Sequence, residues 1–225
     1  MPKEKTLNNI TEELNRWIPG LDVGMPIHVE DIAGFHKWVN WNCFREEGRN
    51  GLGMHRAYDF AAYMNDQREC VLGLPPETPV RSIADGIALF IHCDVLPKKS
   101  PKAYYRRLII KHNSTGLVSE YLHVVPTVKV GQTVTKGDVI ATVYKTPKKF
   151  LKKGDSLVHL HFGLGTCLYV CDLDACITGR LDPRKILPKK SDLYARPQNS
   201  LEFRIARLRR KVSIVIANNY KEYVA

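Results

Sequence analysis

Pairs of histidine and acidic side chains at short spacings are the residues of this sequence best suited to do chemistry. His159 and His161 lie two apart in an apolar run, so in a β-strand both imidazoles point to one face and Leu160 to the other. His55 and Asp59 lie four apart, so their side chains share a face in a strand and also in a helix, and they can converge. Imidazole nitrogens and carboxylate oxygens are good zinc ligands, so both pairs are candidate parts of a metal site.

Each of these patterns also has a simpler explanation. A hydrogen-bonded His55–Asp59 pair would only order a loop, and two histidines at this spacing are common by chance. Tyr121 and His123, at the end of an expected strand, are predicted to share a face, although His123 also fits a half-buried strand position. Two histidines and one aspartate would leave a fourth zinc position open, as catalytic sites do. The remaining histidines would then serve acid–base chemistry near neutral pH.

The elements that must position these residues are short strands separated by turns. Such runs fill residues 51 to about 165 with no long helix between them, which favours an antiparallel β-sandwich or barrel-like sheet over a parallel βαβ fold. Asp85-Gly86 predicts a hairpin. The strands are expected at 79–84, 87–95, 104–112, 117–125, 127–130, 139–144 and 157–164.

The two ends of the chain differ in character from this central part. Apolar residues at helical spacing predict a helix over 7–18, and 21–50 is expected to be an irregular lead-in packed on the core. Residues 200–212 resemble a basic helix. We therefore divide the chain into an N-terminal lead-in (1–50), a central β domain (51–190) and a basic C-terminal extension (191–225).

The composition narrows the range of partners. The 225 residues include 34 Lys and Arg against 23 Asp and Glu, a formal charge of +11 that favours an anionic partner. The charge alone does not choose among nucleic acid, anionic lipid and an anionic wall polymer, although no nucleic-acid-binding signature accompanies it. No segment approaches the roughly 20 apolar residues of a membrane span. Among the six cysteines, the spacing of Cys167, Cys171 and Cys176 favours free thiols or one local disulfide over a metal knot.

The order of the motifs resembles that of the lysostaphin/LytM-type zinc endopeptidases. The pattern is His55-x-x-x-Asp59, then Tyr121-x-His123, then His159-x-His161. The resemblance covers roughly residues 50–187. Three further segments support it: Thr78–Gly86, Val128–Ile140 and Asp182-Pro183.

This resemblance implies an antiparallel β-sandwich of the duplicated hybrid motif type, with a groove over the sheet. It implies one zinc ion per chain, held by His55, Asp59 and His161, with His123 and His159 as the catalytic pair. The implied reaction is hydrolysis of peptide bonds in peptidoglycan stems or cross-bridges, or in glycine-rich peptides. We expect a monomer that works outside the cytoplasm, although no signal peptide is visible in the sequence.

The departures from the family's usual residues affect the expected groove and no ligand. Ala57 and Leu122 each replace a glycine, and Gly163 replaces a glutamate. The family's loop tyrosine before the first histidine is missing, so Arg49 and Tyr121 become the candidates to support the transition state. The alternative function is a catalytically silent member of the fold that acts as a wall-binding or regulatory module. A zinc-free phosphocarrier with two facing histidines ranks lower, because it gives the His55–Asp59 pair no role.

Overall fold

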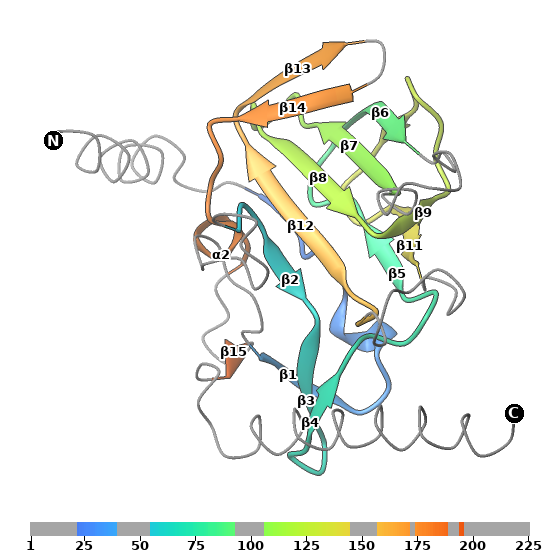
Figure 1. The fold of residues 1–225 in the computed structure, drawn as a ribbon, viewed down its shortest axis with the longest axis vertical. Coiled ribbons are helices and arrows are strands. Elements are labelled where there is room, and N and C mark those ends of the chain that lie inside the picture. Colours follow the sequence, from blue (N-terminus) through green and yellow to red (C-terminus); the bar gives the residue numbers. More distant parts are fainter. Residues whose placement is uncertain are drawn as a thin grey trace, which may run out of the picture.

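Short runs rich in β-branched and aromatic residues form strands in this protein, and nearly all of them pair antiparallel (Figure 1). The computed structural model describes residues 22–39, 55–92, 106–144, 157–171, 174–188 and 194–195. The largest sheet has six strands, in the order β10 (Thr133–Val134), β6 (Gly86–His92), β7 (Arg107–Lys111), β8 (Val118–Leu122), β12 (Leu160–Gly165) and β2 (Tyr58–Phe60).

A three-stranded sheet forms the second layer over this one. It consists of β5 (Pro79–Arg81), β11 (Val139–Val143) and β9 (Val124–Pro126). Val80 and Val143 of this sheet share one buried apolar cluster with Leu108, Tyr121 and Phe162 of the six-stranded sheet. Burial of both inner faces against each other defines a β-sandwich, which confirms the predicted fold class.

A third sheet extends the fold beside β2. It has four strands, in the order β15 (Tyr194–Ala195), β1 (Phe35–Val39), β3 (Ala62–Asn65) and β4 (Cys70–Leu72), and β1 and β15 run parallel. Trp38 of β1 is fully buried, with its ring centroid 5.0 Å from that of Phe60. The prediction of an irregular lead-in over 21–50 is therefore wrong for β1, although its aromatic residues pack on the core as expected. The predicted helices over 7–18 and 200–212 lie outside the described residues.

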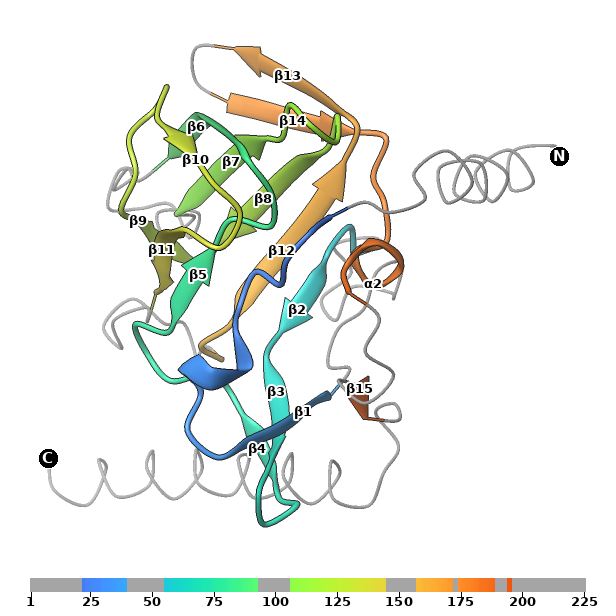
Figure 2. The ribbon, with the colours of Figure 1, turned by 180° about the vertical axis from the view of Figure 1, so that it is seen from behind.

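Residues 22–32 lie on the core face of the six-stranded sheet, where Figure 2 shows them (blue) running beside β12 and β2. Ile27 and Ile32 of this segment, which includes η1 (Val29–Asp31), are buried in the main apolar cluster. The Asp31 carboxylate accepts hydrogen bonds of 3.1 and 3.2 Å from Arg81, and the Gly24 amide donates to the Ile83 carbonyl at 2.6 Å. This segment therefore completes the core.

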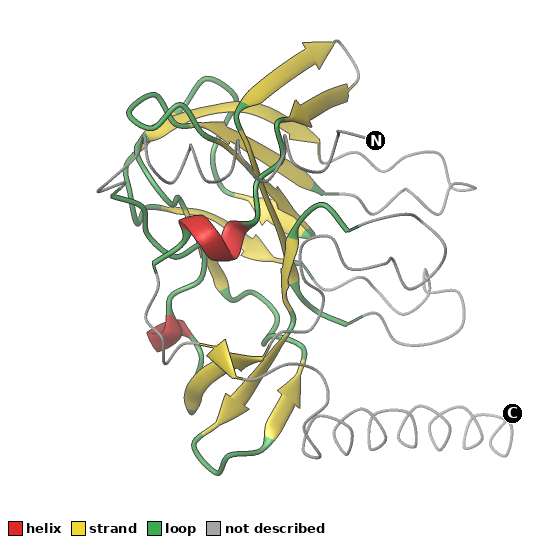
Figure 3. Ribbon diagram, turned by 90° about the vertical axis from the view of Figure 1, so that its left-hand side faces the viewer, coloured by secondary structure: helices red, strands yellow, loops and turns green. Residues whose placement is uncertain are grey.

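Beyond β12 the chain forms a two-stranded hairpin, β13 (Cys167–Cys171) and β14 (Asp174–Thr178), and then α2 (Pro183–Ile186). Figure 3 shows how little of the described chain is helical. Asp182 caps α2, because its side chain accepts a hydrogen bond from the Arg184 amide at 3.0 Å. Cys167 and Cys176 are exposed free thiols. None of the helices in the described ranges is long and apolar enough to cross a bilayer.

Two local predictions are wrong. The chain at Asp85-Gly86 makes no hairpin, because β5 pairs with β11 whereas β6 pairs with β7 and β10, so the bend carries the chain between the layers. Gly86 is needed there for close packing, since a Cβ atom would lie 2.5 Å from the Lys111 carbonyl oxygen. No strand forms over 127–130, and the single strand expected over 117–125 is divided at His123 into β8 and β9.

Candidate metal centre

The register of the six-stranded sheet brings the first candidate ligands together. His161 of β12 lies directly opposite Asp59 of β2, and its neighbours Leu160 and Phe162 are fully buried in the core. Directly opposed residues in an antiparallel pair project from the same face, and successive residues alternate between faces. Asp59 and His161 therefore share the outer face of the sheet, away from the core.

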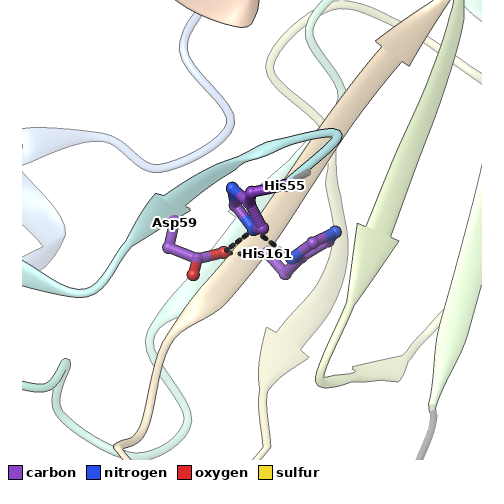
Figure 4. A group of neighbouring side chains, drawn as sticks. All are labelled: His55, Asp59 and His161. Atoms are coloured by element: carbon purple, nitrogen blue, oxygen red, sulfur yellow. Dashed lines mark hydrogen bonds and ion pairs between the residues drawn. The ribbon is translucent and has the colours of Figure 1, made fainter. Parts of the chain in front are cut away.

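Three potential ligand atoms converge at this point (Figure 4). Asp59 Oδ1 lies 3.0 Å from His161 Nδ1 and 3.2 Å from His55 Nε2, and the two imidazole nitrogens are 3.1 Å apart. A tetrahedral zinc ion bound at about 2.0–2.1 Å requires ligand atoms about 3.3–3.4 Å apart. Donor types and spacing therefore both fit a zinc ion, with a fourth position left for another ligand.

Asp59 supplies the negative charge of this cluster. It is only 6% exposed. Burial disfavours its charged form, but hydrogen bonds from His161 and His55 outweigh that effect and hold its pKa well below the usual range. The carboxylate is therefore ionised at neutral pH, as a metal ligand must be.

His159 lies beside the three candidate ligands. Its Nδ1 is 2.7 Å from the Leu157 carbonyl oxygen, so Nδ1 carries the proton and donates it, leaving the lone pair on Nε2 in the neutral ring. Nε2 lies 3.9 Å from Asp59 Oδ1. Burial lowers the pKa of His159, partly opposed by Asp59 and by the Leu157 carbonyl. His159 is therefore a neutral imidazole whose basic nitrogen, Nε2, lies near the ligand cluster.

His123 reaches the same place through an unusual backbone conformation. Its φ is +63°, in the left-handed region, and the chain holds it by hydrogen bonds from its amide to the Arg106 carbonyl (2.9 Å) and from the Tyr144 amide to its carbonyl (2.7 Å). Its ring centroid is 4.6 Å from that of His159 and 6.3 Å from that of His161. Burial, together with the neighbouring histidines, lowers its pKa well below the usual value.

The prediction that Tyr121 and His123 share a face is wrong. Tyr121 is opposite Phe162 in the sheet register and is fully buried in the core, with the two ring centroids 5.2 Å apart. The left-handed residue at 123 breaks the strand alternation, so only His123 lies beside the cluster. Tyr121 therefore does not face the metal position, which argues against direct support of a transition state. Arg49, the other candidate, lies outside the described residues.

Sequence reasoning missed an ionic cluster on this same outer face. Glu120 of β8 is opposite Gly163 of β12, and its carboxylate pairs with both Arg107 and Arg180. Burial would raise the pKa of Glu120, but Arg180 and Arg107 hold it below the usual value. A Cβ atom at Gly163 would lie 2.9 Å from the Glu120 carboxylate. The glycine that replaces the family's glutamate was the one sequence signal of this arrangement.

The described part of the N-terminal lead-in does not cover the cluster. Residues 22–32 pack with Phe60 and Phe162, whose side chains point to the face opposite Asp59 and His161. His28 of this segment lies 3.2 Å from Glu30 and takes no part in the cluster.

The fold and the cluster together define a β-sandwich protein with a candidate three-ligand metal centre. Residues 68–168 match the model of Peptidase family M23, and this match confirms the resemblance drawn from the motifs. The matched range includes His123, His159 and His161, whereas His55 and Asp59 precede it. A search of curated protein sequences finds no match.

Several solved structures are similar to this one. The catalytic domain of the antimicrobial peptidase lysostaphin from Staphylococcus simulans is 19% identical, with a TM-score of 0.43 over 70% of this chain and 95% of that one. A zinc-containing peptidase from Vibrio cholerae is 21% identical, with a TM-score of 0.43 over 73% of this chain but only 40% of that one. LytU is 20% identical, with a TM-score of 0.39 over 75% of this chain and 85% of that one.

Proposed function

We propose that this protein is a zinc-dependent endopeptidase that hydrolyses peptide bonds in peptidoglycan stems or cross-bridges. The observation that carries the proposal is the convergence of His55, Asp59 and His161 at zinc-ligand spacing, with two neutral histidines beside them. The match to a peptidase family supports the reaction class. One zinc ion per chain is the expected cofactor.

His55 Nε2, Asp59 Oδ1 and His161 Nδ1 would hold the ion. Zinc at such a site supplies Lewis-acid polarisation of the scissile carbonyl and lowers the pKa of water to near neutrality. Only one of its three protein ligands is anionic, so the Asp59 carboxylate cancels half of the ion's charge and leaves the site cationic. That residual charge favours the negative charge that develops on the carbonyl oxygen during attack.

His159 and His123 would move the protons. His159 Nε2 is the basic nitrogen nearest the ligand cluster, so it is placed to accept a proton from the attacking water. The tilted His123 ring, 4.6 Å away, can share this task and return a proton to the leaving amine. Both groups have lowered pKa values and are neutral acceptors at pH 7. No covalent nucleophile is required.

Hydrolysis of defined substrates tests the proposal. The purified chain with one equivalent of zinc is incubated with peptidoglycan and with pentaglycine, and new amino termini are identified by mass spectrometry. We expect cleavage that a chelator abolishes and added zinc restores, and that Asp59→Asn lacks. Full zinc occupancy without cleavage of either substrate would contradict the proposal. Peptidoglycan binding without cleavage would instead support the wall-binding module.

The site of action and the partners follow from the proposed substrate. Peptidoglycan lies outside the cytoplasm, so we propose an extracytoplasmic location in the wall, the periplasm or the medium. The formal charge of +11 would hold the protein on an anionic wall polymer by a salt-sensitive attraction. Wall binding that is unchanged between low and high salt would contradict this part of the proposal.

A further inference from the structure

The ionic cluster of Glu120, Arg107 and Arg180 lies on the same face of the sheet as the candidate metal centre. The register aligns Arg107, Leu122, His161 and Asp59 in one row across β7, β8, β12 and β2. Glu120 and Gly163 belong to the next row on this face, two residues along their strands. Two residues of a strand span about 7 Å, so an extended peptide of two or three residues reaches from the metal position to the cluster.

Glu120 fixes the positions of both arginines. Its side chain is 5% exposed, and Oε1 accepts a hydrogen bond from Arg107 Nε at 2.6 Å and forms an ion pair with Arg107 Nη2 at 2.5 Å. Oε2 pairs with Arg180 Nη1. Arg180 Nε donates to the Ile177 carbonyl at 3.1 Å, so its guanidinium is held from two sides.

Gly163 creates the space that Arg180 occupies. A Cβ atom at this position would lie 2.5 Å from Arg180 Nη1, so a side chain of any size would displace the guanidinium. Arg180, which follows β14, therefore lies over β12 two residues beyond His161. Its side chain remains 18% exposed, so part of it is accessible to solvent.

Glu120 is a carboxylate that pairs with both arginines of the cluster, close to the metal position. Desolvating such groups is costly, and apolar side chains commonly replace buried ion pairs without loss of stability. An arginine that is held in place and partly exposed is a good receptor for a carboxylate, since its planar fork matches the two carboxylate oxygens.

We propose that Arg180, held by Glu120, binds a carboxylate of the peptide substrate two or three residues from the scissile bond. The spacing follows from the strand geometry, because an extended peptide covers about 3.3–3.6 Å per residue and Gly163 is about 7 Å from His161 along β12. This inference rests on the proposed peptidase function and specifies which peptides it accepts. A substrate with a free C-terminal carboxylate close to the cleaved bond is preferred over its amide.

Equilibrium binding tests this preference without depending on turnover. The probes are N-acetyl-triglycine as the free acid and as the C-terminal amide, titrated calorimetrically into the zinc-loaded protein. We expect the acid to bind at least about tenfold more tightly, since hydrogen bonds between charged partners exceed neutral ones by this margin. Arg180→Gln should remove the preference, and Arg180→Lys should retain part of it.

Lys129→Gln provides the matched control, because it removes one positive charge from an exposed position in the turn between β9 and β10, outside the strands that carry the cluster. This variant should keep the full preference. Equal binding of acid and amide to the wild type would overturn the inference. A preference that survives in Arg180→Gln would overturn it too, because the carboxylate would then bind the zinc. Unchanged zinc content, together with a cooperative unfolding transition well above the assay temperature, establishes that the variants are folded.

The outcomes separate this inference from the peptidase proposal. An Arg180-dependent preference without cleavage of any glycine peptide would support the carboxylate site and contradict the peptidase. Cleavage with equal binding of acid and amide would support the peptidase and overturn the carboxylate site.

Discussion

Removal of the Glu120 carboxylate should strongly destabilise the fold. Glu120→Ala leaves the guanidinium groups of Arg107 and Arg180 without their shared counter-ion, and these side chains are only 14% and 18% exposed. Breaking a buried ion pair from one side costs about 3–5 kcal/mol. The residual exposure of the arginines lets water solvate them in part, so we expect the lower end, about 3 kcal/mol. In a chain of this size that lowers the melting temperature by about 6–12 °C.

Urea unfolding at pH 7, followed by tryptophan fluorescence, measures this loss. Glu69→Ala is the control, because Glu69 is exposed and its loss should change the unfolding free energy by less than about 0.5 kcal/mol. The double variant Glu120→Ala/Arg180→Ala should be more stable than the two separate losses predict, since it removes one of the stranded charges. A loss below about 1 kcal/mol in Glu120→Ala would refute the reasoning, because the cluster would then be effectively solvated.

Three further predictions concern single side chains. Burial lowers the pKa of His112, so the stability that its neutral form contributes is complete above the unfolded pKa of about 6.5 and is lost as the pH falls below that value. The wild-type protein should therefore lose more unfolding free energy between pH 7.5 and 5.5 than His112→Asn does. Equal losses in the two proteins would contradict this prediction. His123→Ala and His159→Ala should each slow hydrolysis about 10²–10⁴-fold while zinc content stays constant, and loss of zinc would exclude a purely acid–base role. Gly86→Ala should lower the free energy of unfolding in urea by about 1–3 kcal/mol, because the added Cβ would clash with the Lys111 carbonyl oxygen. An unchanged urea midpoint would contradict that clash.

Local periodicity was enough to predict the strand that carries the site. Leu160, His161 and Phe162 alternate as expected, with the apolar pair in the core and the histidine outside. The face of each side chain follows from a period of two along the strand, so no distant contact is needed to assign it. The sandwich class could likewise be predicted from many short strands without a long helix between them.

Features that depend on pairing between distant strands could not be predicted in this way. Glu120 meets Gly163 only because β8 pairs with β12 in one particular register, and Arg180 arrives from beyond β14. The left-handed backbone of His123 depends on hydrogen bonds to Arg106 and Tyr144, so the alternation rule placed Tyr121 on the wrong face. The Asp85-Gly86 signal correctly marked a bend but not the sheets that it connects.

Zinc content tests the central claim most directly. Zinc per molecule is measured after dialysis without chelator for the wild type, for His161→Ala and for His36→Ala, a control that removes an exposed histidine from β1. We predict about one zinc in the wild type and in His36→Ala and close to none in His161→Ala, since two remaining ligands hold zinc poorly. Wild-type protein without zinc, or His161→Ala that retains it, would contradict the three-ligand centre.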